Sequence, residues 1–180
     1  MKSVGEAMAI GRNFQESLQK AIRSLESNHD GFTDMAVGKN FKQMIQQPSP
    51  DRLFYIGQAF REGYSINQVF NLSKIDPWFL SYIKEIIDLE SEIKNRTLDQ
   101  LDKDFLRDLK KRGFSDSRIA YLCSTVETEV YKKRMKNNLK PVFKRVDTCA
   151  AEFDTSTAYL YSTYDDECES RPTTNKKIII

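Results

Sequence analysis

The stretches "REGYS" (residues 61–65) and "KRGFS" (residues 111–115) decide the fold of this chain, because they are two copies of one pattern. A shift of 50 residues places the first copy on the second, and the same shift pairs apolar residues on both sides. These pairs are Tyr55 with Phe105, Ile56 with Leu106, Val69 with Ile119, and Leu72 with Leu122. The sequence therefore contains an internal repeat.

Each copy predicts the same order of elements: a helix, a glycine that ends it, an aromatic residue, a serine N-cap, a short helix, a turn and a longer helix. One such unit is too small to bury its own apolar faces, so we expect two units packed against each other. The predicted fold class is mainly α, a helical domain built from two similar helical units.

The helix boundaries carry recognisable capping signals. A capping residue followed by Glu three positions later, or by Pro at the next position, predicts a helix start. Such pairs are Asn13 with Glu16, Ser49 with Pro50, Asp76 with Pro77, and Ser124 with Glu127. Gly63 and Gly113 suit the left-handed residue that ends a helix.

An apolar stripe follows Pro77, and its aromatic members are Trp78, Phe79 and Tyr82. At helical spacing such a stripe is typical of a core face, so we expect these rings to be buried. The alternative is a self-association face.

The character of the sequence changes after Pro141. Residues 142–148 and 157–164 alternate like extended segments, and residues 173–180 resemble the start of a buried strand. The helical part is thus expected to continue into a partly extended C-terminal wrap.

The composition is that of a soluble, folded protein with room for one good core or two small ones. The chain has 180 residues, 30% of them charged, and a net charge of +2, which favours neither nucleic acid nor a membrane surface as partner. No apolar run reaches the ~18 residues of a membrane span, and residues 1–12 lack the apolar stretch of a secretory signal. Three irregularly spaced cysteines argue against a disulfide framework, so a reducing cytoplasm is expected.

No catalytic constellation stands out. Cys149 and Cys168 are far apart in sequence from the single histidine, His29, and lack the close pair that a zinc site uses. The acidic residues between 165 and 169 lack the spacing of a calcium loop and are expected to form a solvated turn. The sequence also has no glycine-rich phosphate loop. We therefore expect no metal and no catalytic residue in this segment.

Residues 115–138 offer one alternative, a helix-turn-helix DNA-binding module. A short helix, a turn and a basic second helix follow one another there, and such cations could contact phosphates and bases. Against this, acidic residues occupy the start of the second helix, where base contacts normally lie. The cations are Lys132, Lys133, Arg134 and Lys136, and the acidic residues are Glu127 and Glu129.

Several long motifs, in order, resemble the large chain of carbamoyl-phosphate synthase. They are "MKSVGEAMAIGR" (1–12), "IDPWFL" (75–80), "GFSDSRIA" (113–120), "KRVDTCAAEF" (144–153) and "TAYLYSTYDDECE" (157–169). The similarity covers essentially the whole chain. It implies the middle of that enzyme, in which an all-helical oligomerization domain lies between two ATP-grasp synthetic units.

The resemblance implies three parts. Residues 1–26 resemble the C-terminal tail of the carboxyphosphate unit, residues 27–169 the oligomerization domain, and residues 170–180 the start of the carbamoyl-phosphate unit, whose first strand would be severed from its sheet. Residues 140–170 would form the connecting wrap. Residues 27–50 are shorter than the bacterial pattern leads us to expect.

The resemblance also implies roles. The parent would be an ATP-dependent, glutamine-hydrolysing carbon–nitrogen ligase of pyrimidine and arginine biosynthesis, which uses ATP with Mg or Mn and K and a small glutaminase subunit. No cofactor is expected on this segment itself. Glu6 matches a glutamate of the family's carbamate tunnel. Phe41, Met44 and Ile45 are the candidates for an exposed apolar patch at an oligomer interface.

Overall fold

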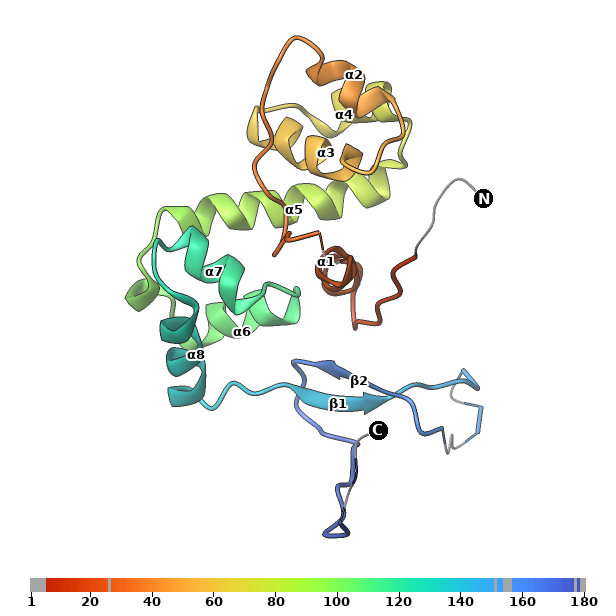
Figure 1. Cartoon of the computed structure of the whole chain (residues 1–180), viewed down its shortest axis with the longest axis vertical. Coiled ribbons are helices and arrows are strands. Elements are labelled where there is room, and N and C mark those ends of the chain that lie inside the picture. Colours follow the sequence, from red (N-terminus) through yellow and green to blue (C-terminus); the bar gives the residue numbers. More distant parts are fainter. Residues whose placement is uncertain (1–5, 26, 151, 154–156, 177, 179–180) are drawn as a thin grey trace.

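A computed structural model describes residues 6–25, 27–150, 152–153, 157–176 and 178. Over these residues the fold is mainly α, which confirms the predicted fold class (Figure 1). The helices are α1 (Phe14–Ser24), α2 (Phe41–Gln46), α3 (Arg52–Arg61), α4 (Ile66–Ser73), α5 (Pro77–Lys94), the 3-10 helix η1 (Leu98–Gln100), α6 (Lys103–Lys111), α7 (Asp116–Leu122) and α8 (Glu127–Lys136). Two short strands follow, β1 (Val142–Arg145) and β2 (Leu160–Thr163).

The internal repeat corresponds to two helical units with the same order of helices. The first unit is α3, α4 and α5, and the second unit is α6, α7 and α8. Equivalent backbone hydrogen bonds close the first turn of each unit: the Tyr64 amide donates to the Ala59 carbonyl at 3.0 Å, and the Phe114 amide donates to the Leu109 carbonyl at 3.1 Å. The predicted pair of similar units is therefore confirmed.

Both glycines of the repeat have the backbone conformation that the sequence predicts. Gly63 has a φ of 83° and Gly113 a φ of 89°. Side chains with a Cβ are strained in this left-handed region, so glycine ends α3 and α6 at the lowest cost.

Two of the predicted helix starts are confirmed and two are wrong. Asn13 accepts a hydrogen bond from the Glu16 amide, and Asp76 accepts one from the Trp78 amide. Ser49 does not cap α3, which begins at Arg52. Ser124 has a φ of 53° and ends α7 instead of starting α8, because it is the equivalent of left-handed Lys74 at the end of α4. The 50-residue shift pairs Ser124 with Lys74, so the repeat itself predicts a helix end at Ser124.

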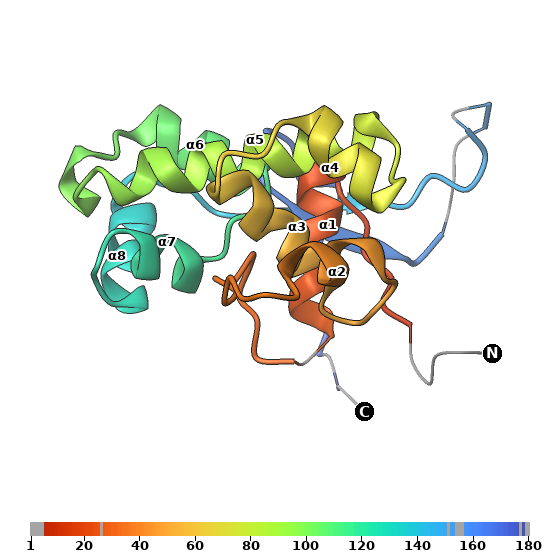
Figure 2. The same ribbon diagram turned by 90° about the horizontal axis from the view of Figure 1, so that it is seen from above.

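Helix α5 is the spine of the domain. It contacts α1, α3, α4 and α7, and in Figure 1 it runs between the group of α2, α3 and α4 on one side and the group of α6, α7 and α8 on the other. Its buried apolar side chains are Leu80, Ile83, Ile86, Ile87 and Ile93. Seen from above in Figure 2, α1 lies beneath this spine. Both units therefore share one core.

Helix α2 covers the first unit, and its apolar face points inward. Phe41 is 5% exposed and Ile45 is 0% exposed, while Met44 is half-buried. The Phe41 ring packs edge-on against the rings of Tyr55 and Tyr64. The expectation that these residues form an exposed patch is wrong for Phe41 and Ile45, because a six-residue helix has one apolar face and α3 and α4 cover it.

The C-terminal wrap contains the two predicted extended segments. β1 and β2 pair as an antiparallel ladder in which Val142 lies opposite Thr163. The expected strand over 173–180 lies partly outside the described residues, and its described part, 173–176 and 178, is not in a strand.

Candidate functional site

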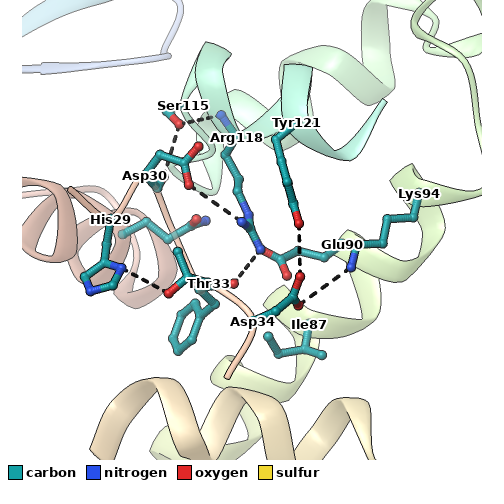
Figure 3. A network of polar contacts seen from close by, with 12 residues as sticks. His29, Asp30, Thr33, Asp34, Ile87, Glu90, Lys94, Ser115, Arg118 and Tyr121 are labelled. Atoms are coloured by element: carbon teal, nitrogen blue, oxygen red, sulfur yellow. Dashed lines mark hydrogen bonds and ion pairs between the residues drawn. The ribbon is translucent and has the colours of Figure 1, made fainter. Parts of the chain in front are cut away.

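A buried ionic junction joins the two units, and Figure 3 shows it from close by. Its centre is the guanidinium of Arg118, a residue of α7 with only 2% of its side chain exposed. Arg118 Nε donates to Glu90 Oε1 on α5 at 2.7 Å, and its other nitrogens reach the Phe32 carbonyl and the Asp30 carboxylate. One side chain thus connects α7, α5 and the loop of residues 27–40.

Glu90 binds a second arginine with its other oxygen. Arg61 of α3 donates to Glu90 Oε2 at 2.6 Å and also to the Phe32 carbonyl at 2.5 Å. Glu90 has 1% of its side chain exposed, so both of its charged contacts are shielded from water. A buried carboxylate is tolerated only when it is paired and hydrogen-bonded, and here two guanidinium groups provide this.

The exposed rim of the junction is formed around Asp34. Tyr121 donates a hydrogen bond to its carboxylate at 3.1 Å, and Arg61 and Lys94 lie 3.3 and 3.7 Å from it. Burial alone would raise the pKa of Asp34, but the two cations outweigh burial and the pKa is lowered. The same hydrogen bond raises the pKa of Tyr121. The carboxylate is therefore kept ionised as a partner for both units.

The loop that carries these contacts is fitted closely to them. A Cβ at Gly31 would lie 3.2 Å from the Arg118 side chain, and a Cβ at Gly57 would lie 2.7 Å from the Phe32 ring. His29 stacks on Phe54 with ring centroids 4.1 Å apart. A Cβ at Gly57 would therefore force the Phe32 ring to move, and a Cβ at Gly31 would require the Arg118 side chain to shift by a few tenths of an ångström.

This junction is suited to holding structure. Its polar groups bind one another and backbone carbonyls. His29 also has a partner within the loop, since its Nδ1 lies 3.0 Å from the Thr33 hydroxyl. The junction was not predicted from the sequence, although the sequence contains one signal of it. Glu90 lies on the apolar stripe of α5 between Ile87 and Ile93, where a charge has to find a buried partner.

The cysteines and the acidic turn are not brought together into a site. In the part of the chain that the structure describes, Cys123, Cys149 and Cys168 are all free thiols, and no group of His, Cys, Asp and Glu side chains could hold a metal ion. The acidic turn is solvated as expected, with residues 166–168 exposed. Asp166 pairs with Arg107 of α6, and Glu169 lies 3.2 Å from Lys144 of β1. The turn therefore ties the wrap to the helices.

The basic helix of the DNA-binding hypothesis is engaged in internal contacts. Arg134 is 7% exposed and forms an ion pair with Asp116 at 2.8 Å. Lys133 donates to the Leu98 carbonyl at 2.6 Å, and Lys132 pairs with Glu129 at 2.7 Å. Arg134 and Lys133 are thus committed to the fold, whereas Lys132 is 69% exposed and pairs with an acidic residue of the same helix. The structure gives the DNA-binding hypothesis no support.

Four aromatic rings form a surface cluster, which we call the aromatic patch: Phe14, Trp78, Phe79 and Tyr82. Phe14 lies 5.4 Å from Trp78 and 5.3 Å from Phe79, between ring centroids. Trp78 is 51% exposed and Phe79 is 42% exposed, so the expectation that these two rings lie in the core is wrong. Exposed rings grouped in this way are typical of a contact surface.

The remaining predicted site residue is Glu6, which is exposed and lies in the irregular segment before α1. Its role in a carbamate tunnel stays a prediction, as does an interface role for α2. Over the described residues, none of the helices is both long enough and apolar enough to cross a membrane.

Together these features define a class of protein: a helical scaffold domain, whose two units are joined by buried ion pairs. The sequence model of the carbamoyl-phosphate synthetase large chain, oligomerisation domain, matches residues 6–138. Similar proteins include the carbamoyl phosphate synthase large chains of Pasteurella multocida (53% identical), Buchnera aphidicola (54%) and Haemophilus ducreyi (50%). Each match covers 100% of this chain and 17% of the relative. The chain belongs to the carbamoyl-phosphate synthase large-chain family and contains its oligomerisation domain.

Proposed function

We propose that this segment is a non-catalytic joint between two ATP-dependent synthetic units of a glutamine-hydrolysing carbamoyl-phosphate synthase in the cytoplasm. The whole large chain would bind ATP on the flanking units, together with K⁺ and with Mg²⁺ or Mn²⁺. It would receive ammonia from a small glutaminase subunit. Its product would supply pyrimidine and arginine synthesis. The similarity to carbamoyl phosphate synthase large chains supports the ligase, and the chain spans 17% of the length of these relatives.

The observation that carries the proposal is the junction of Arg61, Glu90 and Arg118. It fixes the loop of residues 27–40, the first unit and the second unit into one block through side chains that are 1–11% exposed. A domain that connects two large units has to keep them in a fixed relative orientation. Buried, fully paired charges favour one arrangement of the helices over others.

We further propose that the joint self-associates through the aromatic patch. A second copy of this chain is the occupant that the family's oligomerisation domain favours. Aromatic rings are enriched in the buried centres of such interfaces. Phe41, Met44 and Ile45 contribute less by this proposal, since two of the three are already buried within the chain.

Two measurements test the proposal. Bicarbonate-dependent ATP hydrolysis and carbamoyl phosphate formation should both be absent for this chain, and turnover with either would refute a non-catalytic joint. Sedimentation of Trp78→Glu should show a shift toward the monomer. Tyr131→Glu is the matched control, because Tyr131 is 52% exposed on α8, away from the aromatic patch. Equal oligomer distributions for both variants would place the contact elsewhere.

A further inference from the structure

A small polar pocket lies where α1, the turn between α6 and α7, and the end of β2 meet. Its volume is about 180 Å³. Lys20 and Arg23 of α1, Lys110 of α6, Gly113 of the turn, and Thr163 at the end of β2 all line it. These residues are far apart in the sequence, and Figure 1 shows α1 above the hairpin, beside the second unit. The family's oligomerisation role does not account for this pocket.

The cations of the pocket have hydrogen-bond donors to spare. Lys110 has three N–H groups, of which two are used: its ammonium donates to the Phe114 carbonyl at 2.6 Å and to Asp116 Oδ1 at 2.7 Å. Arg23 has five N–H groups, and its contact among the described residues is one bond from Nη1 to the Gly113 carbonyl at 2.7 Å.

Lys20 differs from the other two, because all its donors are used. Its ammonium donates to the Ile10 and Ser162 carbonyls and lies 2.7 Å from Glu16 Oε1. Lys20 and Glu16 therefore form a satisfied pair at the wall of the pocket. The excess positive charge lies around Arg23 and Lys110, because Lys110 has to share its carboxylate partner Asp116 with Arg134.

The Thr163 hydroxyl is an independent observation that points to a ligand in this pocket. The residue is 1% exposed, and its Oγ1 has no hydrogen-bond partner among the described residues. A buried hydroxyl without a partner costs roughly 1–3 kcal/mol. The cost is removed if the hydroxyl donates to a group held inside the pocket.

The electrostatics agree with this geometry. Burial is the leading cause that lowers the pKa of Arg23, and burial also lowers the pKa of Lys110 to about 8 despite the nearby Asp116. Asp116 is shared with Arg134, which binds it through two nitrogens. For Arg23, the nearby carboxylates Asp30 and Glu16 offset this burial only in part. Positive charge in this pocket is thus desolvated in excess of the negative charge around it.

We propose that the pocket binds a small inorganic oxyanion of the size of phosphate, held by the free N–H groups of Arg23 and Lys110 and by the Thr163 hydroxyl. A guanidinium presents parallel N–H groups that fit two oxygens of one anion, and an ammonium and a hydroxyl complete the set. The volume suits one such ion better than a longer organic acid. Bound there, the ion would fasten α1 and the hairpin to the second unit.

Inorganic phosphate is the probe, titrated into the whole chain at constant ionic strength with sodium chloride as the reference. Anything that binds the folded state alone raises its melting temperature with concentration. We expect phosphate to raise the melting temperature and chloride to leave it unchanged. Equal effects of the two salts would overturn the proposal.

Two variants test the assigned residues. Arg23→Gln should weaken phosphate binding by about tenfold or more, the loss expected for a charge-assisted hydrogen bond. Thr163→Val keeps the shape and removes the hydroxyl. It should leave stability without phosphate equal or higher, since an unpaired hydroxyl is lost, yet weaken phosphate binding several-fold.

The matched control is Lys132→Gln, which removes an exposed cation from α8, outside the pocket. It should keep the phosphate affinity of the natural chain. If Arg23→Gln proves unfolded by circular dichroism, Thr163→Val decides the matter. Phosphate affinities that are the same in Thr163→Val and Lys132→Gln would overturn the assignment.

Discussion

The two helical units have the same backbone plan and different interiors. At equivalent positions of the repeat, the first unit has Phe60 and Ile66, and the second unit has Lys110 and Asp116. Phe60 is 7% exposed and packs in the apolar core with Ile66. Lys110 is also 7% exposed, yet it is paired with Asp116 at 2.7 Å.

The neighbours of each unit explain this difference. Helix α2 covers the first unit with apolar side chains, so its interior can be apolar. The second unit faces α1 and the hairpin, and Tyr164 from beyond β2 places its ring 5.3 Å from the Lys110 ammonium. The comparison shows that turns and caps fix the path of the chain, while the covering elements decide which chemistry fills it.

The largest expected effect comes from breaking the junction that both units share. Glu90→Leu leaves Arg61 and Arg118 buried without their carboxylate and should lower the free energy of unfolding by about 3–5 kcal/mol. Urea unfolding measures this loss.

The double variant Glu90→Leu with Arg118→Met should lose less than the single variant. The single variant leaves two buried arginines without Glu90, whereas the double variant leaves only Arg61, which keeps Asp34 at 3.3 Å. Fewer buried charges without a partner cost less. A double variant less stable than the single one would contradict this account of the junction.

Alanine at Gly63 and alanine at Gly113 should destabilise the chain by different amounts, although the two glycines are equivalent in the repeat. Gly63→Ala should cost about 1–2 kcal/mol, the strain of a left-handed residue, since its Cβ would meet no atom within 4 Å. Gly113→Ala should cost roughly 1–3 kcal/mol more, because its Cβ would lie 2.8 Å from the Glu16 Cα. Equal losses in urea unfolding would show that α1 does not pack on the second unit as described.

The pH dependence of stability should distinguish the ionic interior from the apolar one. The pKa of Lys110 is lowered from 10.5 to about 8 in the folded state by burial. Since the unfolded chain then binds this proton more tightly, stability should rise with pH between 8 and 10.5, by roughly 2 kcal/mol from pH 8 to 9.5. Burial also raises the pKa of Tyr164 to about 12, which opposes the rise above pH 10.

The control for this prediction is Lys110→Met. The free energy of unfolding of this variant should lack the rise with pH that Lys110 causes. Burial raises the pKa of the Cys123 thiol, but both proteins contain this thiol, so its effect cancels when one profile is subtracted from the other. Urea unfolding of both proteins between about pH 8 and about pH 9.5, in steps of roughly half a pH unit, gives the two free energies of unfolding to compare. Parallel profiles for the two proteins would contradict the lowered pKa.

The smallest expected effect concerns the start of the third helix in each unit. α5 begins with the capping side chain of Asp76, whereas Val126, the equivalent residue before α8, makes no capping hydrogen bond. Val126→Ser should therefore stabilise the chain by about 0.5–1 kcal/mol, and Asp76→Ala should destabilise it by about 1 kcal/mol. Thermal unfolding resolves both, and a destabilised Val126→Ser would contradict the equivalence of the two starts.

Much of the fold was predictable because its signals are local. The two glycines and the Asp76 cap depend on residues next to each other in the chain, and the repeat is one such local pattern that occurs twice. The structure confirms all three. The family membership was also predictable, since long ordered motifs carry it. The Ser124 prediction failed for a local reason too: an N-cap and a left-handed helix end favour similar small polar residues.

The candidate sites were predicted less well, because burial depends on distant neighbours. Trp78 has the apolar neighbours Pro77 and Phe79, and Phe41 lies between the polar residues Asn40 and Lys42. Yet the Trp78 ring is 51% exposed and the Phe41 ring 5%. The sequence places Arg134 on a basic helix suited to DNA, but its guanidinium pairs with Asp116 at 2.8 Å. No sequence spacing brings Arg23, Lys110 and Thr163 to one pocket.

The sequence by itself determined that this chain folds as two like helical units, since backbone conformation at glycines and caps is set within a few residues. Only the tertiary structure decided which charges are buried together and which aromatic rings remain at the surface. The physical reason is that desolvation and ion pairing are properties of the space around a side chain, and elements far apart in the sequence fill that space.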